Sequence, residues 1–131
     1  MLIAVAGAVS AMKDDVLSAL NFCPWTHQIS KLMKATPFGS DRFIHHWCER
    51  HEIPIEHFEA PFNLMEGFGM LQRSKEILDH ADGLLAIFDG KDRHTLDAIE
   101  YALKKRIQTV VYRYEDKGFD YLLEPRFGYS Y

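Results

Sequence analysis

Short apolar runs alternate along the chain with longer segments in which apolar residues recur every three or four positions. Continuous short runs are typical of strands buried on both faces, and the longer periodic segments are typical of helices packed on a core. The runs predict strands at Leu2–Ala6, Ile29–Ala35, Ile53–Phe58, Leu84–Phe88 and Thr109–Tyr112. The chain is therefore expected to begin in a sheet.

The segments between these runs predict helices, because their apolar residues recur at helical spacing and capping or acidic residues stand near several of their starts. They begin near Ser10, at Ser40 or Asp41, near Met70 and at His94. A strict order of strand and helix implies right-handed crossovers between parallel neighbours. We therefore predict an α/β fold, a Rossmann-like three-layer domain with a mostly parallel sheet of about five strands.

The end of the chain lacks a clear period but is rich in aromatic residues. A free linker would not carry so many large apolar side chains. We therefore divide the chain into an α/β domain over residues 1–113 and an aromatic tail over residues 114–131. The tail is expected to pack on the domain or on a partner subunit, in a homodimer or a larger homo-oligomer.

Composition narrows the class of protein. The chain has 131 residues, 47% of them hydrophobic, which suffices for one core but not for two ordinary domains. Its net charge of −4 offers no overall positive field for nucleic acid or an anionic membrane, so neither partner is expected. Cys23 and Cys48 form no CxxC pair or disulfide framework, and no apolar run is long enough for a signal peptide or a membrane span. A cytoplasmic protein is expected.

Candidate chemistry lies where predicted strands lead into helices, at residues 7–10, 36–41 and 89–95. In an open parallel sheet, ligands bind beyond the carboxyl ends of the strands, where helix N-termini attract anions and glycine allows close approach of a phosphate. The candidate ligand-binding residues are Gly7, Ser10, Gly39, Ser40, Asp41, Asp89, Gly90 and Thr95. Each glycine alone is more often a turn residue, so the argument rests on three junctions at one edge. Neither GxxxxGK[ST] nor GxGxxG occurs, which disfavours ordinary ATPases and dinucleotide dehydrogenases.

Two stretches, FGSDRFIHHWCERHEIPIEHFEAPF and HADGLLAIFDGKDRHTLDAIEYALKK, resemble the SLOG superfamily, and above all its small YspA- and DprA-like branch. Residues 39–42 match that branch's GADR-like segment, residues 89–95 match its DGxSxGT-like loop, and the similarity covers residues 1–113. The resemblance implies a Rossmann-like sheet that binds nucleotides, NAD-derived molecules or nucleoside phosphates at these loops.

The chain departs from the SLOG pattern at the glycine-rich loop and at residues 8–10, which replace a typical serine-arginine start, and it departs from the related lysine-decarboxylase-like phosphoribohydrolase branch at one position. His94 stands where the glycine-rich loop usually has glycine, and Ala98 falls where that branch has a catalytic glutamate. Arg73 matches an arginine of that branch, so Arg73 and His94 are the catalytic candidates if the chain is an enzyme. Their carboxylate partner stays open among Glu66, Asp89 and Asp92, which the sequence does not distinguish.

These features favour a binding module, a sensor or sequestering protein for a nucleotide or NAD-derived ligand, with no cofactor of its own. The alternatives are an N-glycosidase or (deoxy)ribosyltransferase acting on nucleoside monophosphates, and a degenerate domain used for protein–protein contact with His94 filling the former site. A metal site among the polar residues of positions 45–51 is disfavoured, because no HExxH pattern occurs and neighbouring helix positions point to different sides. Arg42 is a further candidate for contact with a phosphate, and Trp25 and Trp47 are expected in the core.

Overall fold

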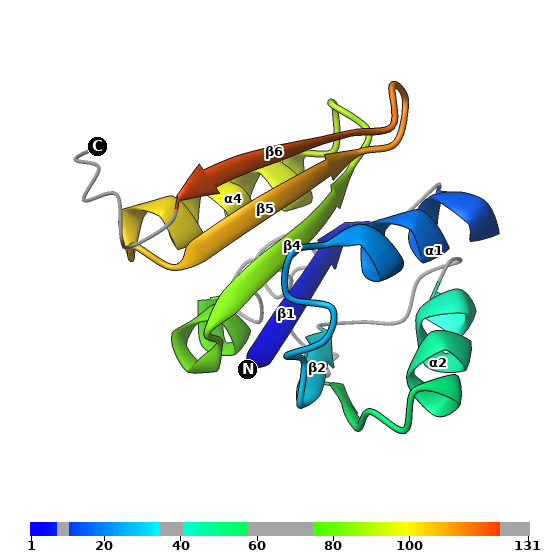
Figure 1. Ribbon diagram of the computed structural model, residues 1–131. Coiled ribbons are helices and arrows are strands. Elements are labelled where there is room, and N and C mark those ends of the chain that lie inside the picture. The colour runs from blue at the N-terminus through cyan, green and yellow to red at the C-terminus, as the bar shows by residue number, and fades with distance from the viewer. Residues whose placement is uncertain (8–10, 35–40, 58–74, 124–131) are drawn as a thin grey trace, which may run out of the picture.

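The protein is described by a computed structural model that covers residues 1–7, 11–34, 41–57 and 75–123 (Figure 1). In these residues one six-stranded sheet has the order β3-β2-β1-β4-β5-β6. Neighbouring strands from β3 to β5 run parallel, and β6 runs antiparallel to β5. The strands are β1 (Leu2–Gly7), β2 (Lys31–Lys34), β3 (Ile55–His57), β4 (Gly83–Phe88), β5 (Gln108–Arg113) and β6 (Gly118–Leu123).

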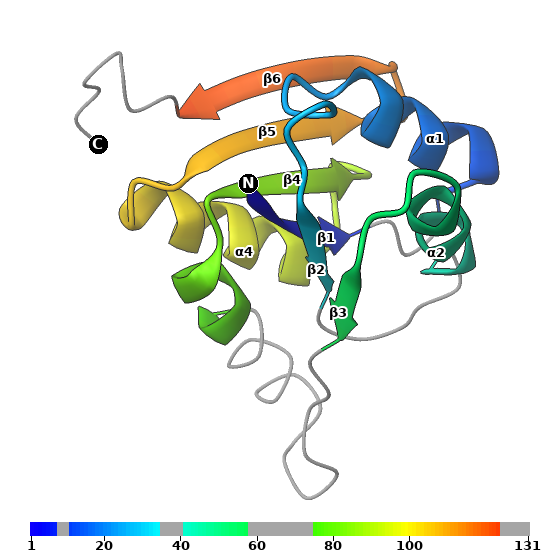
Figure 2. The same ribbon diagram turned by 60° about the horizontal axis from the view of Figure 1, so that its bottom comes forward.

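Helices cover both faces of this sheet. Figures 1 and 2 show α1 and α4 on opposite sides of it. One core cluster contains residues of α1 and α2, and the second contains residues of α4 and of the helix at residues 75–80. The helices are α1 (Lys13–Phe22), α2 (Asp41–Arg50) and α4 (Arg93–Lys104). The predicted three-layer, mostly parallel α/β fold is confirmed.

Burial along the strands matches the pattern of the apolar runs. In β4 every residue from Gly83 to Ile87 is buried, as expected for a central strand covered by helices on both faces. Trp25 and Trp47 lie in one core cluster, with exposed fractions of 7% and 3%. Cys23 and Cys48 are free and lie in the same cluster, where burial raises the pKa of the Cys23 thiol.

The first helix begins later than Ser10, which lies outside the described residues. It starts at Lys13, and the Asp15 carboxylate accepts a hydrogen bond from the N–H of the preceding Met12 at 3.1 Å. A carboxylate in this position satisfies a backbone donor at the helix start and suits the positive end of the helix dipole. The acidic residues that predicted the helix thus mark its first turn more closely than the serine does.

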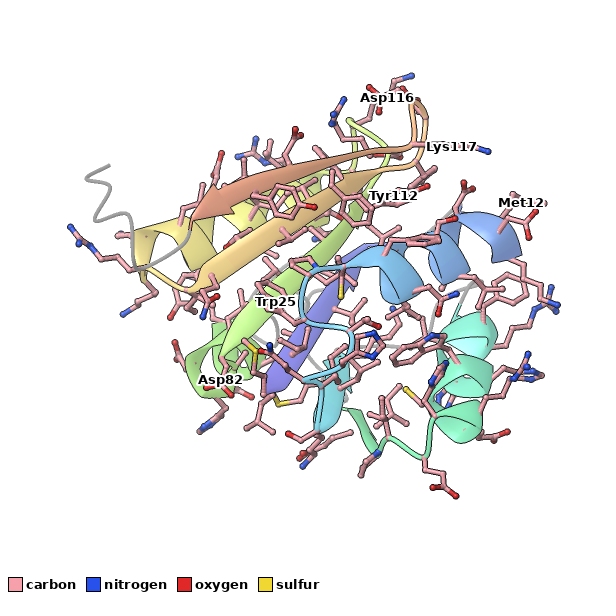
Figure 3. All side chains as sticks on the ribbon, in the orientation of Figure 1. Met12, Trp25, Asp82, Tyr112, Asp116 and Lys117 are labelled. Atoms are coloured by element: carbon pink, nitrogen blue, oxygen red, sulfur yellow. The ribbon has the colours of Figure 1, made fainter. Side chains whose placement is uncertain are left out.

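The start of the tail forms a strand that the sequence interpretation missed. Residues 118–123 pair antiparallel with β5, after a turn in which Lys117 has a φ of 56°. Figure 3 shows Tyr112 on β5 and Lys117 at this turn. The Phe119 ring packs on Tyr112 with 4.8 Å between ring centroids. This part of the tail therefore packs on the domain, while residues 124–131 lie outside the description.

Among the described residues, no helix combines the length and the apolar character that a membrane crossing requires.

Candidate functional site

The strand order creates one point where the chain leaves the sheet in opposite directions. From β1 the chain continues through α1 to β2 on one side, and from the neighbouring β4 it continues through α4 to β5 on the other. At such a switch point the two connections diverge and leave a crevice beyond the carboxyl ends of the strands, where ligands bind in open α/β sheets. The first and third predicted junctions both start there.

Gly7 ends β1 at this point and lies against the end of β4. Its φ is 88°, and a Cβ atom added to it would lie 2.2 Å from the Ile87 carbonyl oxygen and 2.9 Å from Thr95 Oγ1. A side chain is therefore excluded both by the backbone conformation and by the neighbouring backbone. The same contact brings the end of β1 against the first turn of α4.

The loop after β4 is organised by two aspartates. Asp89 Oδ1 accepts hydrogen bonds from the N–H groups of Lys91 and Asp92, each at 2.7 Å. These bonds, that of Lys91 first, lower the pKa of the Asp89 carboxyl. Gly90 has a φ of 87° and open space around the position of a Cβ, so it serves the turn rather than close packing.

Asp92 caps α4. Its Oδ2 atom accepts hydrogen bonds from the Thr95 N–H at 3.2 Å and from the Thr95 hydroxyl at 2.5 Å. Thr95 is 1% exposed, so its hydroxyl is buried in this bond to Asp92 and is not presented to a ligand. Within the described residues, the first-turn N–H groups of Arg93 and His94 have no acceptor. These two donors are the part of the α4 N-terminus that an anion can reach.

Four of the described candidates, Gly7, Asp89, Gly90 and Thr95, lie together at the ends of β1 and β4. Contacts and hydrogen bonds link Gly7 to Thr95, Thr95 to Asp92 and Asp92 to Asp89, with Gly90 in the same loop. His94 is exposed in the first turn of α4. Asp41 begins α2, and the candidates outside the described residues are Ser10, Gly39, Ser40 and Arg73.

Lys34 is a residue that the sequence interpretation missed. It is the last residue of β2, stands in register with Val5 of β1, and is only 3% exposed. A buried ammonium group is costly unless it has polar or charged partners, and Lys34 does interact within the protein. The signal in the sequence was a lysine at the end of a buried strand. It places a buried lysine with partners inside the protein at the end of the strand next to β1.

The carboxylates near α4 have structural partners. Ala98, where the SLOG resemblance would place a glutamate, is 2% exposed and packs in the core. Asp97 pairs with Arg93, with 3.2 Å between Oδ1 and Nε. The lowered pKa keeps Asp89 ionised near neutral pH, which is unsuitable for a general acid.

The polar residues of α2 do not assemble a metal site in the part of the chain that is described, where no group of three or more metal-ligating side chains comes together. Cys48 is buried, and the His51 ring packs on Trp47 with 4.4 Å between centroids.

Comparison with known proteins finds no protein family, no curated protein and no solved structure that matches this chain. The SLOG resemblance therefore stays a prediction.

Gly7→Ala is expected to destabilise the protein by at least about 3 kcal/mol, because it combines a positive φ with a clash against the Ile87 carbonyl. Gly90→Ala is the matched control, with the same φ but open space, and is expected to cost about 1 kcal/mol. Urea denaturation of both variants measures the difference. An equal loss of unfolding free energy in the two variants would contradict the claim that the Ile87 carbonyl excludes a side chain at Gly7.

Asp89→Ala is expected to lower the free energy of unfolding by about 1 kcal/mol at neutral pH, because two backbone donors lose their acceptor. The native pKa of Asp89 is lowered, so its contribution is present above the unfolded value of about 3.9 and disappears as the pH falls through the native value. Denaturation from pH 7 to pH 2 measures the effect. Asp89→Asn keeps a neutral acceptor and should lose less, and a constant gap between wild type and Asp89→Ala across this range would contradict the assignment.

Proposed function

We propose that this chain binds a phosphate-bearing nucleotide or NAD-derived ligand beyond the carboxyl ends of β1 and β4, as a sensor or sequestering module. The observation that carries the proposal is the contact of Gly7 with Ile87 and Thr95, which brings a glycine strand end and a helix N-terminus together at the switch point. The resemblance to the SLOG superfamily agrees with this location.

The polar groups of this edge suit a ligand that carries both phosphate and ribose. The N–H groups of Arg93 and His94, which have no acceptor among the described residues, favour a phosphate. Asp89 and Asp92 each use one carboxylate oxygen in the hydrogen bonds of this loop. Their other oxygens can accept hydrogen bonds from ribose hydroxyls, as acidic residues do in nucleotide sites. Inorganic phosphate has no ribose hydroxyls to donate to these carboxylates, so their negative charges would only repel it.

The alternatives have less support. An N-glycosidase or (deoxy)ribosyltransferase needs an acid, base or nucleophile at the reacting centre, and the position that the resemblance gives to a catalytic glutamate holds the buried Ala98, while its neighbour Asp97 pairs with Arg93. A degenerate site filled by His94 conflicts with the exposure of that side chain. Binding without turnover is therefore the function we propose.

A thermal-shift screen against AMP, deoxynucleoside monophosphates, NAD, ADP-ribose and cyclic nucleotides tests the proposal, because a ligand that binds only the native state raises the melting temperature. Each ligand that raises it is then followed by chromatography for release of free base. A shift with an intact ligand supports the binding module. Release of base would replace it by the N-glycosidase, and the absence of any shift would leave protein–protein contact.

His94→Glu is expected to weaken binding of the screened ligand at least about tenfold, because it places a negative charge beside the phosphate donors. The same charge at a helix N-terminus favours α4, so the melting temperature without ligand should hold or rise. The matched control is His27→Glu, an exposed residue in the connection from α1 to β2, at the opposite edge of the sheet. Calorimetric titration of both variants measures the effect, and equal affinities would contradict the proposed location.

A further inference from the structure

A groove separates α1 from α2 on the outer side of these helices, which lie next to each other in Figure 1. Its volume is about 490 Å³, within the range of small-ligand sites. It is lined by one stripe of α1 and two of α2, together with the residue after α2, which comprise Lys13, Leu17, Asn21, Arg42, Phe43, His46, Trp47, Arg50 and His51. It belongs to neither the β1–β4 crevice nor the loop after β4.

The lining of the groove is basic in an acidic chain. Lys13, Arg42 and Arg50 contribute three cations, and of the described residues that line it none carries a carboxylate. Within the part of the chain that is described, Lys13 and Arg50 form no ion pair. The chain as a whole has a net charge of −4, so this concentration of positive charge is local.

Two of these cations stand where helix electrostatics disfavour them. Lys13 is the first residue of α1 and Arg42 the second residue of α2, both at the positive end of a helix dipole. The positive charge of each side chain is less favourable at a helix N-terminus than it would be at a helix C-terminus. An anion bound between them would satisfy both the side-chain charges and the nearby helix ends.

The spacing of the charges indicates an extended ligand. Arg42, His46 and Arg50 follow one another at one helical turn each, so the Cα atoms of Arg42 and Arg50 are about 12 Å apart. An anion with several phosphates in line can therefore contact more of this row at once than a single phosphate can. Two residues that line the groove also join its two helices: the Trp47 Nε1–H on α2 donates a hydrogen bond to Asn21 Oδ1 on α1 at 2.7 Å.

We propose that the groove between α1 and α2 binds an elongated polyphosphate anion, inorganic or organic, independently of the nucleotide site. Charge complementarity selects the phosphate groups, and the row of basic side chains selects several of them in line. The volume suits a small molecule rather than a long polymer.

Isothermal titration calorimetry of the full chain at low salt with sodium tripolyphosphate and with orthophosphate tests this proposal. Tripolyphosphate is expected to bind at least about tenfold more tightly, because it reaches more than one basic side chain. The double variant Lys13→Gln, Arg50→Gln should weaken tripolyphosphate binding at least about tenfold. The matched double variant Lys104→Gln, Lys105→Gln removes the same charge at the end of α4, on the other face of the sheet, and should change it less than about twofold.

Three results would overturn the proposal. Absence of tripolyphosphate binding would exclude the site. An equal loss of tripolyphosphate affinity in the two double variants would show that the anion responds to the overall charge of the protein and not to this groove. A twelve-residue oligothymidylate that bound more tightly than tripolyphosphate, and with the same dependence on Lys13 and Arg50, would assign the groove to single-stranded nucleic acid instead. Circular dichroism of each variant establishes that it is folded before titration.

Discussion

The close contact between the ends of β1 and β4 is the constraint on which the rest of the site depends. At Gly7 there is room for a hydrogen atom and none for a methyl group, because the Ile87 carbonyl oxygen and the Thr95 hydroxyl lie so near. This contact joins the strand end to the first turn of α4 at the switch point of the sheet. A larger residue would push apart the two connections that form the crevice.

The N-terminus of α4 is partly satisfied by its own loop. Asp89 and Asp92 bind the N–H groups of Lys91, Asp92 and Thr95, which keeps the loop ordered without a ligand. The remaining donors and the outer carboxylate oxygens then present phosphate-binding and hydroxyl-binding groups side by side. This combination is the reason for proposing a nucleotide rather than a bare anion as the ligand.

The fold was largely predictable from the sequence, because continuous apolar runs such as residues 84–87 are buried on both faces of the sheet, as their pattern indicates. β6 was missed because its aromatic residues also suited an irregular tail, although Phe119 and Tyr121 alternate around Asp120 as in a strand. Gly7 was predicted as a candidate, but the carbonyl that excludes a side chain comes from β4, which no local pattern reveals. The groove was missed because Lys13 and Arg50 come to line one groove only through the packing of α1 on α2.

The central claim is that a nucleotide binds at the edge formed by Gly7 and the start of α4. Amide chemical shifts in a ¹⁵N-labelled sample titrated with AMP and with ADP-ribose test it most directly, because they locate the ligand on the chain. The account predicts that the largest changes occur at Gly7, Gly90, Arg93 and His94. Changes confined to the α1–α2 groove, or no changes with either ligand, would contradict it.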